Sequence, residues 1–97
     1  MEPITLLLIA LLFGAGAAIV IEILSWSTVD EYVLSKSVAN GSARIIRKRL
    51  ESGRYQVVVG VFRPSGSKIV SQSWDAAQLD TTLQTHFGGQ DVIQIKT

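Results

Sequence analysis

The sequence predicts an α+β protein in which a single N-terminal transmembrane helix precedes a small β-β-β-α-β domain. No charged residue occurs from Pro3 to Ile21, and all nine Lys and Arg residues lie after this run. After residue 74 the hydrophobic period changes from about two to about 3.6. A chain of 97 residues has room for one membrane segment and one small domain. We expect an anchor over residues 1–26, a linker or short helix over 27–42, and an α+β domain over 43–97.

The charge-free run is the strongest signal in the chain. At about 1.5 Å per residue, a helix over residues 3–21 is roughly 28 Å long, which nearly spans a hydrocarbon layer of about 30 Å. Its Leu, Ile, Phe and Val side chains favour insertion by on the order of 3 to 7 kcal/mol, and Trp26 follows as an expected anchor at the membrane interface. Two alternatives stay open: a helix buried between subunits, and a signal peptide cleaved near Ala15-Gly16-Ala17.

Orientation follows from the basic residues. Lys36 and the basic residues after it all lie C-terminal to the helix, so the positive-inside rule predicts a single-pass membrane protein with a cytoplasmic carboxyl domain. The triplet Asn40-Gly41-Ser42 is a glycosylation sequon, which would be used only in a lumenal domain.

Small residues recur every four positions in the expected helix and end on a carboxylate. Such a stripe shares one helix face and lets a second helix approach closely. We therefore expect membrane protein subunits, or a second copy of the chain, to pack against this face, which consists of Ala10, Gly14, Ala18 and Glu22.

Residues 27–40 fit two structures. Ser27 and Thr28, followed by Asp30 and Glu31, are typical of a capping box that opens a helix ending near Asn40-Gly41. The same Asn-Gly pair could instead turn a hairpin between residues 32–39 and 43–50. We favour the helix.

Three strands, a helix and a final strand are expected in the domain. The strand over residues 54–62 carries apolar side chains on both faces, so it should be central. Asp75-Ala76-Ala77-Gln78 resembles a cap that opens the helix, and Gly88-Gly89 ends it. This order resembles in outline a β-grasp or similar sandwich, without a motif specific to one family. The expected strands cover residues 43–50, 54–62, 68–74 and 91–97, and the helix covers 75–88.

No catalytic, metal or cofactor site is predicted. The chain has no cysteine, and its one histidine, His86, falls in the last turn of the expected helix, where a surface position is typical. Asp75 and Asp80 point about 140° apart on that helix, so they do not form a catalytic pair. Ser65 and Ser67 have no partner base. We expect no enzyme activity and no cofactor.

The best candidate for binding is a basic cluster. Four charges in six residues near a membrane could each gain about 1 kcal/mol against anionic lipid, or could hold another polyanion. The alternative is an edge strand whose charges discourage pairing with other sheets. Nucleic acid is not expected, because no aromatic side chains are interleaved with the charges. The cluster consists of Arg44, Arg47, Lys48 and Arg49.

A second basic segment, Arg63–Lys68, contains donors for an anion but lacks the Gly-Lys-Ser/Thr order of a phosphate loop, so a hairpin turn is favoured there.

The function predicted from these patterns is a non-catalytic, single-pass accessory or adaptor subunit of a larger membrane protein assembly, whose small domain mediates protein-protein interaction. Its partners would be membrane lipid and other subunits. The alternative is a membrane-anchored module that binds anionic lipid or another polyanion through the basic cluster.

Overall fold

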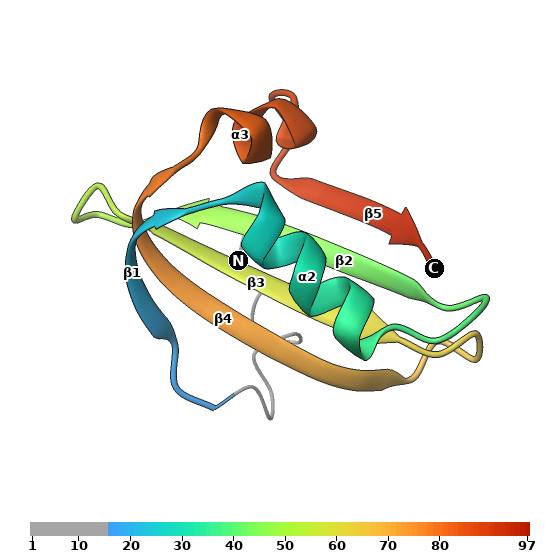
Figure 1. The fold of residues 1–97 in the computed structure, drawn as a ribbon. Helices are drawn as coiled ribbons and strands as arrows, with labels where there is room; N and C mark the ends of the chain where they lie inside the picture. The colour runs from blue at the N-terminus through green and yellow to red at the C-terminus, as the bar shows by residue number, and fades with distance from the viewer. Residues whose placement is uncertain (1–15) are drawn as a thin grey trace.

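A five-stranded sheet with two helices forms the protein in the computed structural model, which describes residues 16–97 (Figure 1). The α+β fold class is therefore confirmed. The strand order in the sheet is β1-β4-β3-β2-β5. The elements in chain order are β1 (Ile19–Leu24), α2 (Trp26–Lys36), β2 (Ser42–Arg49), β3 (Tyr55–Phe62), β4 (Lys68–Leu79), α3 (Thr81–Phe87) and β5 (Val92–Lys96).

Strand β1 was not expected. It runs parallel to β4, with Ile19 opposite Trp74 and Ile21 opposite Ala76. The predicted transmembrane helix is therefore wrong for residues 19–21, and the expected anchor over 1–26 is wrong where it overlaps β1. Hydropathy alone does not separate a buried helix from an apolar strand, and the β-branched segment Ile19–Leu24 suits a strand.

The remainder of the charge-free run, residues 3–15, lies outside the described part of the chain. Between residues 16 and 97, neither helix has the length and apolar character needed to cross a membrane. Only the part of the predicted anchor that precedes β1 therefore remains as an expectation.

Helix α2 follows β1 after one residue. Ser25 is its N-cap, and the Ser25 hydroxyl accepts a hydrogen bond from the backbone N–H of Thr28 at 3.2 Å. The helix ends at Lys36, earlier than the Asn40-Gly41 end that we expected. Of the two structures considered for residues 27–40, the chain forms the helix and not the hairpin.

Strands β2, β3 and β4 form an antiparallel meander close to the predicted ranges, and β3 is the middle strand of the sheet. The predicted helix start at Asp75 is wrong, because β4 continues to Leu79. Asp80 caps the shorter helix α3 and accepts a hydrogen bond from the N–H of Leu83 at 2.8 Å. Pairing with β1 supplies backbone partners for residues 74–79, which keeps them extended.

The main core lies between the sheet and α2, which crosses the front of the sheet in Figure 1. We call this side of the sheet the helix face; Ile45, Val57, Val59 and Trp74 are among its buried side chains. Val29 and Val33 pack onto it from α2, while Leu83 and Phe87 of α3 complete one end. The opposite side, which we call the rear face, carries Arg44, Ile46, Val58, Ser73 and Lys96.

Tyr32 is a polar group within the core. Its ring packs edge-to-face against Trp74, with 5.7 Å between the ring centroids. Its hydroxyl is buried and has no hydrogen-bond partner among residues 16–97. Burial raises the pKa of Tyr32 above its ordinary value of 10.0, because desolvation disfavours the phenolate.

This burial predicts a loss of stability in alkali. The unfolded chain ionises Tyr32 near pH 10.0 while the folded chain keeps the proton, so the free energy of unfolding falls as pH rises from 10.0 through the folded pKa. Tyr32→Phe should remove this part of the fall, and should raise stability at pH 7 by up to about 1 kcal/mol because an unpaired hydroxyl is lost. Urea unfolding of the full chain in neutral detergent, followed by circular dichroism, measures both effects.

Tyr55→Phe is the matched control, since the Tyr55 hydroxyl contacts Arg49 at 3.4 Å near the surface. Parallel alkaline profiles for the wild type and Tyr32→Phe would contradict the prediction.

Candidate functional site

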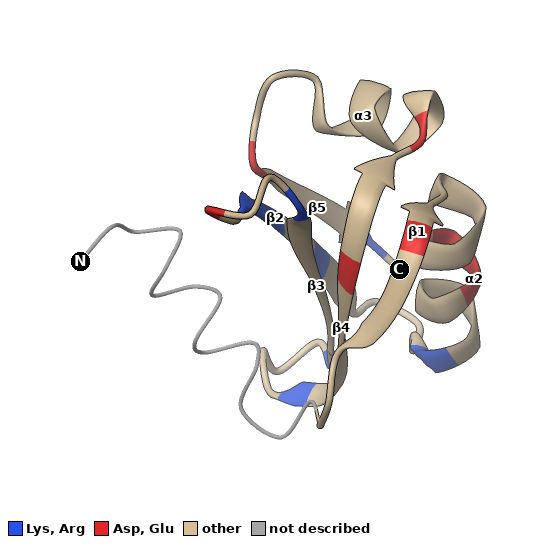
Figure 2. Cartoon of the chain, turned by 90° about the vertical axis from the view of Figure 1, so that its left-hand side faces the viewer, with Lys and Arg blue, Asp and Glu red and all other residues tan. Residues whose placement is uncertain are grey.

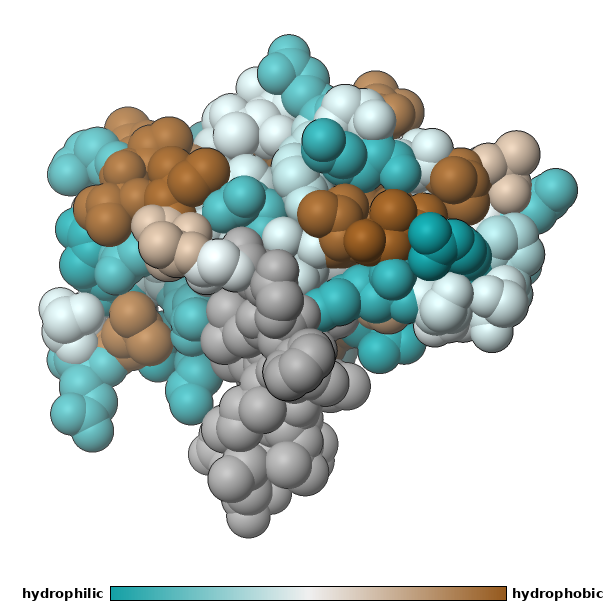
Figure 3. Space-filling view, turned by 90° about the horizontal axis from the view of Figure 1, so that it is seen from below, coloured by the Kyte–Doolittle hydropathy of each residue, from teal (hydrophilic) through white to brown (hydrophobic). Residues whose placement is uncertain are grey.

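The outer edge of β1 exposes apolar side chains. Ile19, Val20 and Ile23 are 48%, 73% and 50% exposed, and all three lie on β1, which is an edge strand. Figure 3 shows hydrophobic surface on the side of the molecule that includes β1 and β4. Exposed edges are templates for pairing with another chain, and charges commonly protect them. β1 carries only one charged residue, Glu22, and Figure 2 shows the strand with this single red segment. We call this surface the β1 edge.

Arg54 fastens β1 to β4. Its Nε donates to the Asp75 carboxylate at 2.5 Å, and its Nη2 donates to the carbonyl oxygens of Ile21 and Asp75 at 3.2 and 3.1 Å. Because Arg54 directly precedes β3, its guanidinium links β3 to both β1 and β4. Asp75, expected as a helix cap, is instead the acidic partner of this arginine.

Asp80 ties the far end of β1 to α3. Its backbone N–H donates to the carbonyl of Leu24 at 2.9 Å, and its carboxylate accepts from the N–H of Trp26 at 3.2 Å. The N-terminal ends of α2 and α3 thus share one carboxylate, which favours both because helix N-termini are electropositive. Arg54 therefore holds the middle of β1 and Asp80 its C-terminal end, while no strand between residues 16 and 97 pairs with its outer edge.

Trp26, the expected interface anchor, is the first residue of α2. Its ring stacks on the His86 ring, with 3.7 Å between centroids and 24° between planes. His86 lies in the last turn of α3 and is exposed, so it occupies the helix-end position predicted from the sequence.

The residues of the small-residue stripe are not brought onto one described helix. Ala10 and Gly14 lie outside the described residues. Ala18 precedes β1, and Glu22 lies in the middle of β1. A helical stripe that includes Glu22 is therefore wrong.

The basic cluster lies on β2, an interior strand between β3 and β5, so the alternative of a charged edge strand is wrong. Alternation along the strand places Arg44 and Lys48 on the rear face, and Arg47 and Arg49 on the helix face. Four charges that are adjacent in sequence therefore do not form one patch.

Aromatic rings hold three members of the cluster. The guanidinium of Arg47 lies 4.6 Å from the centroid of the Phe87 ring and pairs with Asp91 at 3.1 Å. The guanidinium of Arg49 lies 5.5 Å from the Tyr55 ring, and that of Arg44 lies 5.8 Å from the Phe62 ring. Contacts of this kind stabilise the domain itself.

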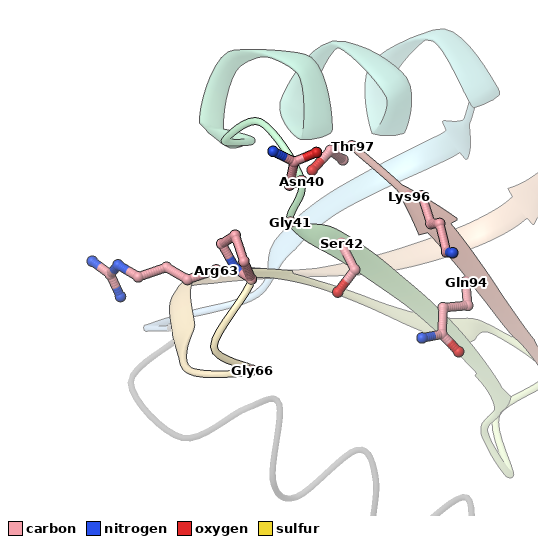
Figure 4. Close-up of a pocket in the computed structure, with 9 residues that line it drawn as sticks. Asn40, Gly41, Ser42, Arg63, Gly66, Gln94, Lys96 and Thr97 are labelled. Atoms are coloured by element: carbon pink, nitrogen blue, oxygen red, sulfur yellow. The ribbon is translucent and has the colours of Figure 1, made fainter.

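A pocket of about 490 Å³ opens at one end of the sheet (Figure 4). Three segments that are distant in sequence line it: the loop before β2, the turn between β3 and β4, and the end of β5. Its charged lining residues are Arg63 and Lys96. Sequence reasoning considered the Arg63–Lys68 turn but had no signal that would join it to β5.

Within residues 16–97, no three His, Cys, Asp or Glu side chains gather in a way that could hold a metal ion. Asp75 and Asp80 occupy separate structural positions, as described above, and Ser65 bonds to Ser67 through the two hydroxyls at 3.1 Å. Comparison with protein families, with curated proteins and with solved structures finds no match to this chain.

The arginine link predicts how firmly β1 is attached. Arg54→Gln should lower the free energy of unfolding by about 1 to 2 kcal/mol, because hydrogen bonds from a charged donor to Asp75 and Ile21 are lost. Amide exchange of β1 should accelerate more than exchange of β3. Hydrogen exchange of the full chain, read by mass spectrometry, tests this, with Arg49→Gln as the control. Equal exchange of β1 in the two variants would show that Arg54 does not hold the strand.

Proposed function

We propose that this protein is a non-catalytic accessory or adaptor subunit of a membrane protein assembly. The residues before β1 anchor it in the membrane, and the domain formed by residues 19–97 binds a partner protein along the β1 edge. One observation carries the proposal. The charge-free run leads directly into an edge strand, and this strand exposes the apolar side chains of Ile19, Val20 and Ile23.

Because β1 takes residues 19–21 and residues 16–18 are not helical, the proposed anchor is the segment 3–15. As a helix it would be about 20 Å long, which requires a thin bilayer or one thinned locally at a cost of fractions of a kcal/mol per Å. The basic residues all follow this segment, so the positive-inside rule still places the domain in the cytoplasm. Of the small-residue stripe, Ala10 and Gly14 remain in this segment, and another helix, or a second copy, could pack on them.

The β1 edge suits addition of one extended segment from a partner. Main-chain hydrogen bonds supply affinity in this mode, and alternate side chains supply specificity. Ile19 and Ile21 lie on the helix face of the strand, opposite Trp74 and Ala76, whereas Val20 and Glu22 lie on the rear face. We infer that the partner segment has apolar residues on one face and a basic residue opposite Glu22.

A membrane-surface module is the second candidate. The observation that favours it is the position of Arg44 and Lys48 on the rear face together with Lys96. Anionic lipid would then contact the rear face and not the whole basic cluster. Binding of this kind weakens steeply with salt, which distinguishes it from strand addition.

Membrane attachment is tested by alkaline carbonate extraction of native membranes. The full chain should stay with the pellet. A variant with Leu8→Lys and Leu11→Lys should move to the supernatant, because each lysine at the centre of a helix costs roughly 2.5 to 3.5 kcal/mol of insertion free energy. Leu34→Lys, at an exposed position of α2, should change nothing. Release of the wild-type chain would remove the anchor from the proposal.

Partner binding is tested by purification in mild detergent. The double variant Val20→Lys, Ile23→Lys should reduce the amount of partner that co-purifies with the chain at least about tenfold, because lysine on an edge strand opposes pairing with another strand. Leu34→Lys is again the control, because Leu34 is exposed on α2. Circular dichroism confirms that each variant is folded. A partner retained equally by all three proteins would show that the β1 edge is not the docking site.

A further inference from the structure

The pocket at the end of the sheet is built from rigid parts. The N–H of Thr97 donates to the carbonyl of Gly41 at 3.1 Å, and the Thr97 hydroxyl donates to the carbonyl of Val38 at 2.7 Å. These bonds fasten the end of β5 to the loop before β2. A Cβ at residue 41 would overlap the carbonyl oxygen of Phe62, so only glycine permits this approach of loop and strand.

The opposite wall is the turn between β3 and β4. The N–H of Arg63 donates to the carbonyl of Ser67, and the N–H of Gly66 donates to the carbonyl of Arg63, each at 2.9 Å. Gly66 has a φ of 91°, which favours glycine. Backbone hydrogen bonds therefore fix both walls without a ligand.

The charged side chains of the lining have one sign. Arg63 and Lys96 are cationic, and none of the lining side chains is acidic. Both ion pairs seen within residues 16–97 lie elsewhere, at Arg47–Asp91 and Arg54–Asp75. Ser42, Gln94 and Asn40 add neutral donors. Arg44 lies on the same face, directly opposite Gln94 in the β2–β5 pair, and adds to the positive potential.

We propose that this pocket binds a phosphate-bearing anion. Ser42 lies on the pocket floor, with Lys96 and Gln94 on the same side of the sheet (Figure 4). Lys96 supplies the primary charge. The Arg63 side chain extends outward in Figure 4 and is exposed, so it can rotate to close over a bound anion. Phosphate attracts such mixed sets, because charged donors neutralise it and hydroxyl and amide groups complete its hydrogen bonds.

The size and chemistry of the pocket define the ligand class. About 490 Å³ exceeds the volume of a phosphate ion and falls within the range of sites for small molecules. Polar and apolar groups contribute nearly equal surface to the lining, so the rest of the ligand carries both hydroxyl groups and hydrocarbon. A phosphomonoester with a short hydroxylated body meets these conditions, either as a free metabolite or as the head group of a phosphatidic acid. The proposal does not depend on the membrane anchor or on the β1 edge.

The test uses the full ¹⁵N-labelled chain in neutral detergent micelles, titrated with sn-glycerol 3-phosphate and followed by the amide signals of Gly41, Ser42 and Gly66. Saturable shifts are expected at these amides. Lys96→Gln should weaken binding at least about fivefold, and Arg63→Gln should weaken it less. Lys36→Gln is the matched control, because Lys36 is an exposed lysine at the end of α2 and is not among the residues that line the pocket.

A parallel experiment in nanodiscs identifies the source of the phosphate. Phosphatidylcholine discs with and without phosphatidic acid are compared. Shifts of the same amides only with phosphatidic acid assign the site to a lipid head group, whereas shifts only with glycerol phosphate assign it to a free phosphomonoester. Absence of saturable shifts in both experiments would overturn the proposal, as would equal weakening by Lys96→Gln and Lys36→Gln.

Discussion

The parallel pairing of β1 with β4 is the constraint on which the rest of the fold depends. Because β4 is antiparallel to β3 and β3 is antiparallel to β2, β1 runs parallel to β2 although two strands lie between them. Helix α2 connects β1 to β2 and must therefore cross the sheet over β4 and β3. This crossing determines which face carries the core, and Val29 and Val33 fill the space between helix and sheet.

The same pairing explains which predictions failed. The meander of β2, β3 and β4 is encoded locally, by alternating apolar residues and glycine-containing turns, and could be located from the sequence. The end of β4 could not, because the spacing of Ala76, Leu79 and Leu83 is that of an amphipathic helix. The extended conformation of Ala76 and Leu79 depends on β1, which lies more than fifty residues away in the sequence. The same holds for Ile19–Leu24: hydropathy predicted a membrane helix there, but pairing with β4 makes the segment a strand.

Candidate sites showed a related limit. Sequence reasoning located both the basic cluster and its strand but treated the four charges as one patch, whereas alternation along the strand sends Arg44 and Arg47 to opposite faces. The end pocket joins three segments through the contacts of Gly41 and Thr97, and no local pattern specifies such contacts. His86 was simpler, because its position in a helix end depends only on nearby residues.

The separation of β1 from β4 along the chain also affects synthesis. β1 leaves the ribosome before its partner, and Leu24 can pair with Leu79 only after the intervening chain has been made. At roughly 5 to 20 residues per second, this delay is about 3 to 11 s. During that interval the apolar nascent strand lacks its partner in the sheet, so a chaperone, the translocon or lipid can contact it first.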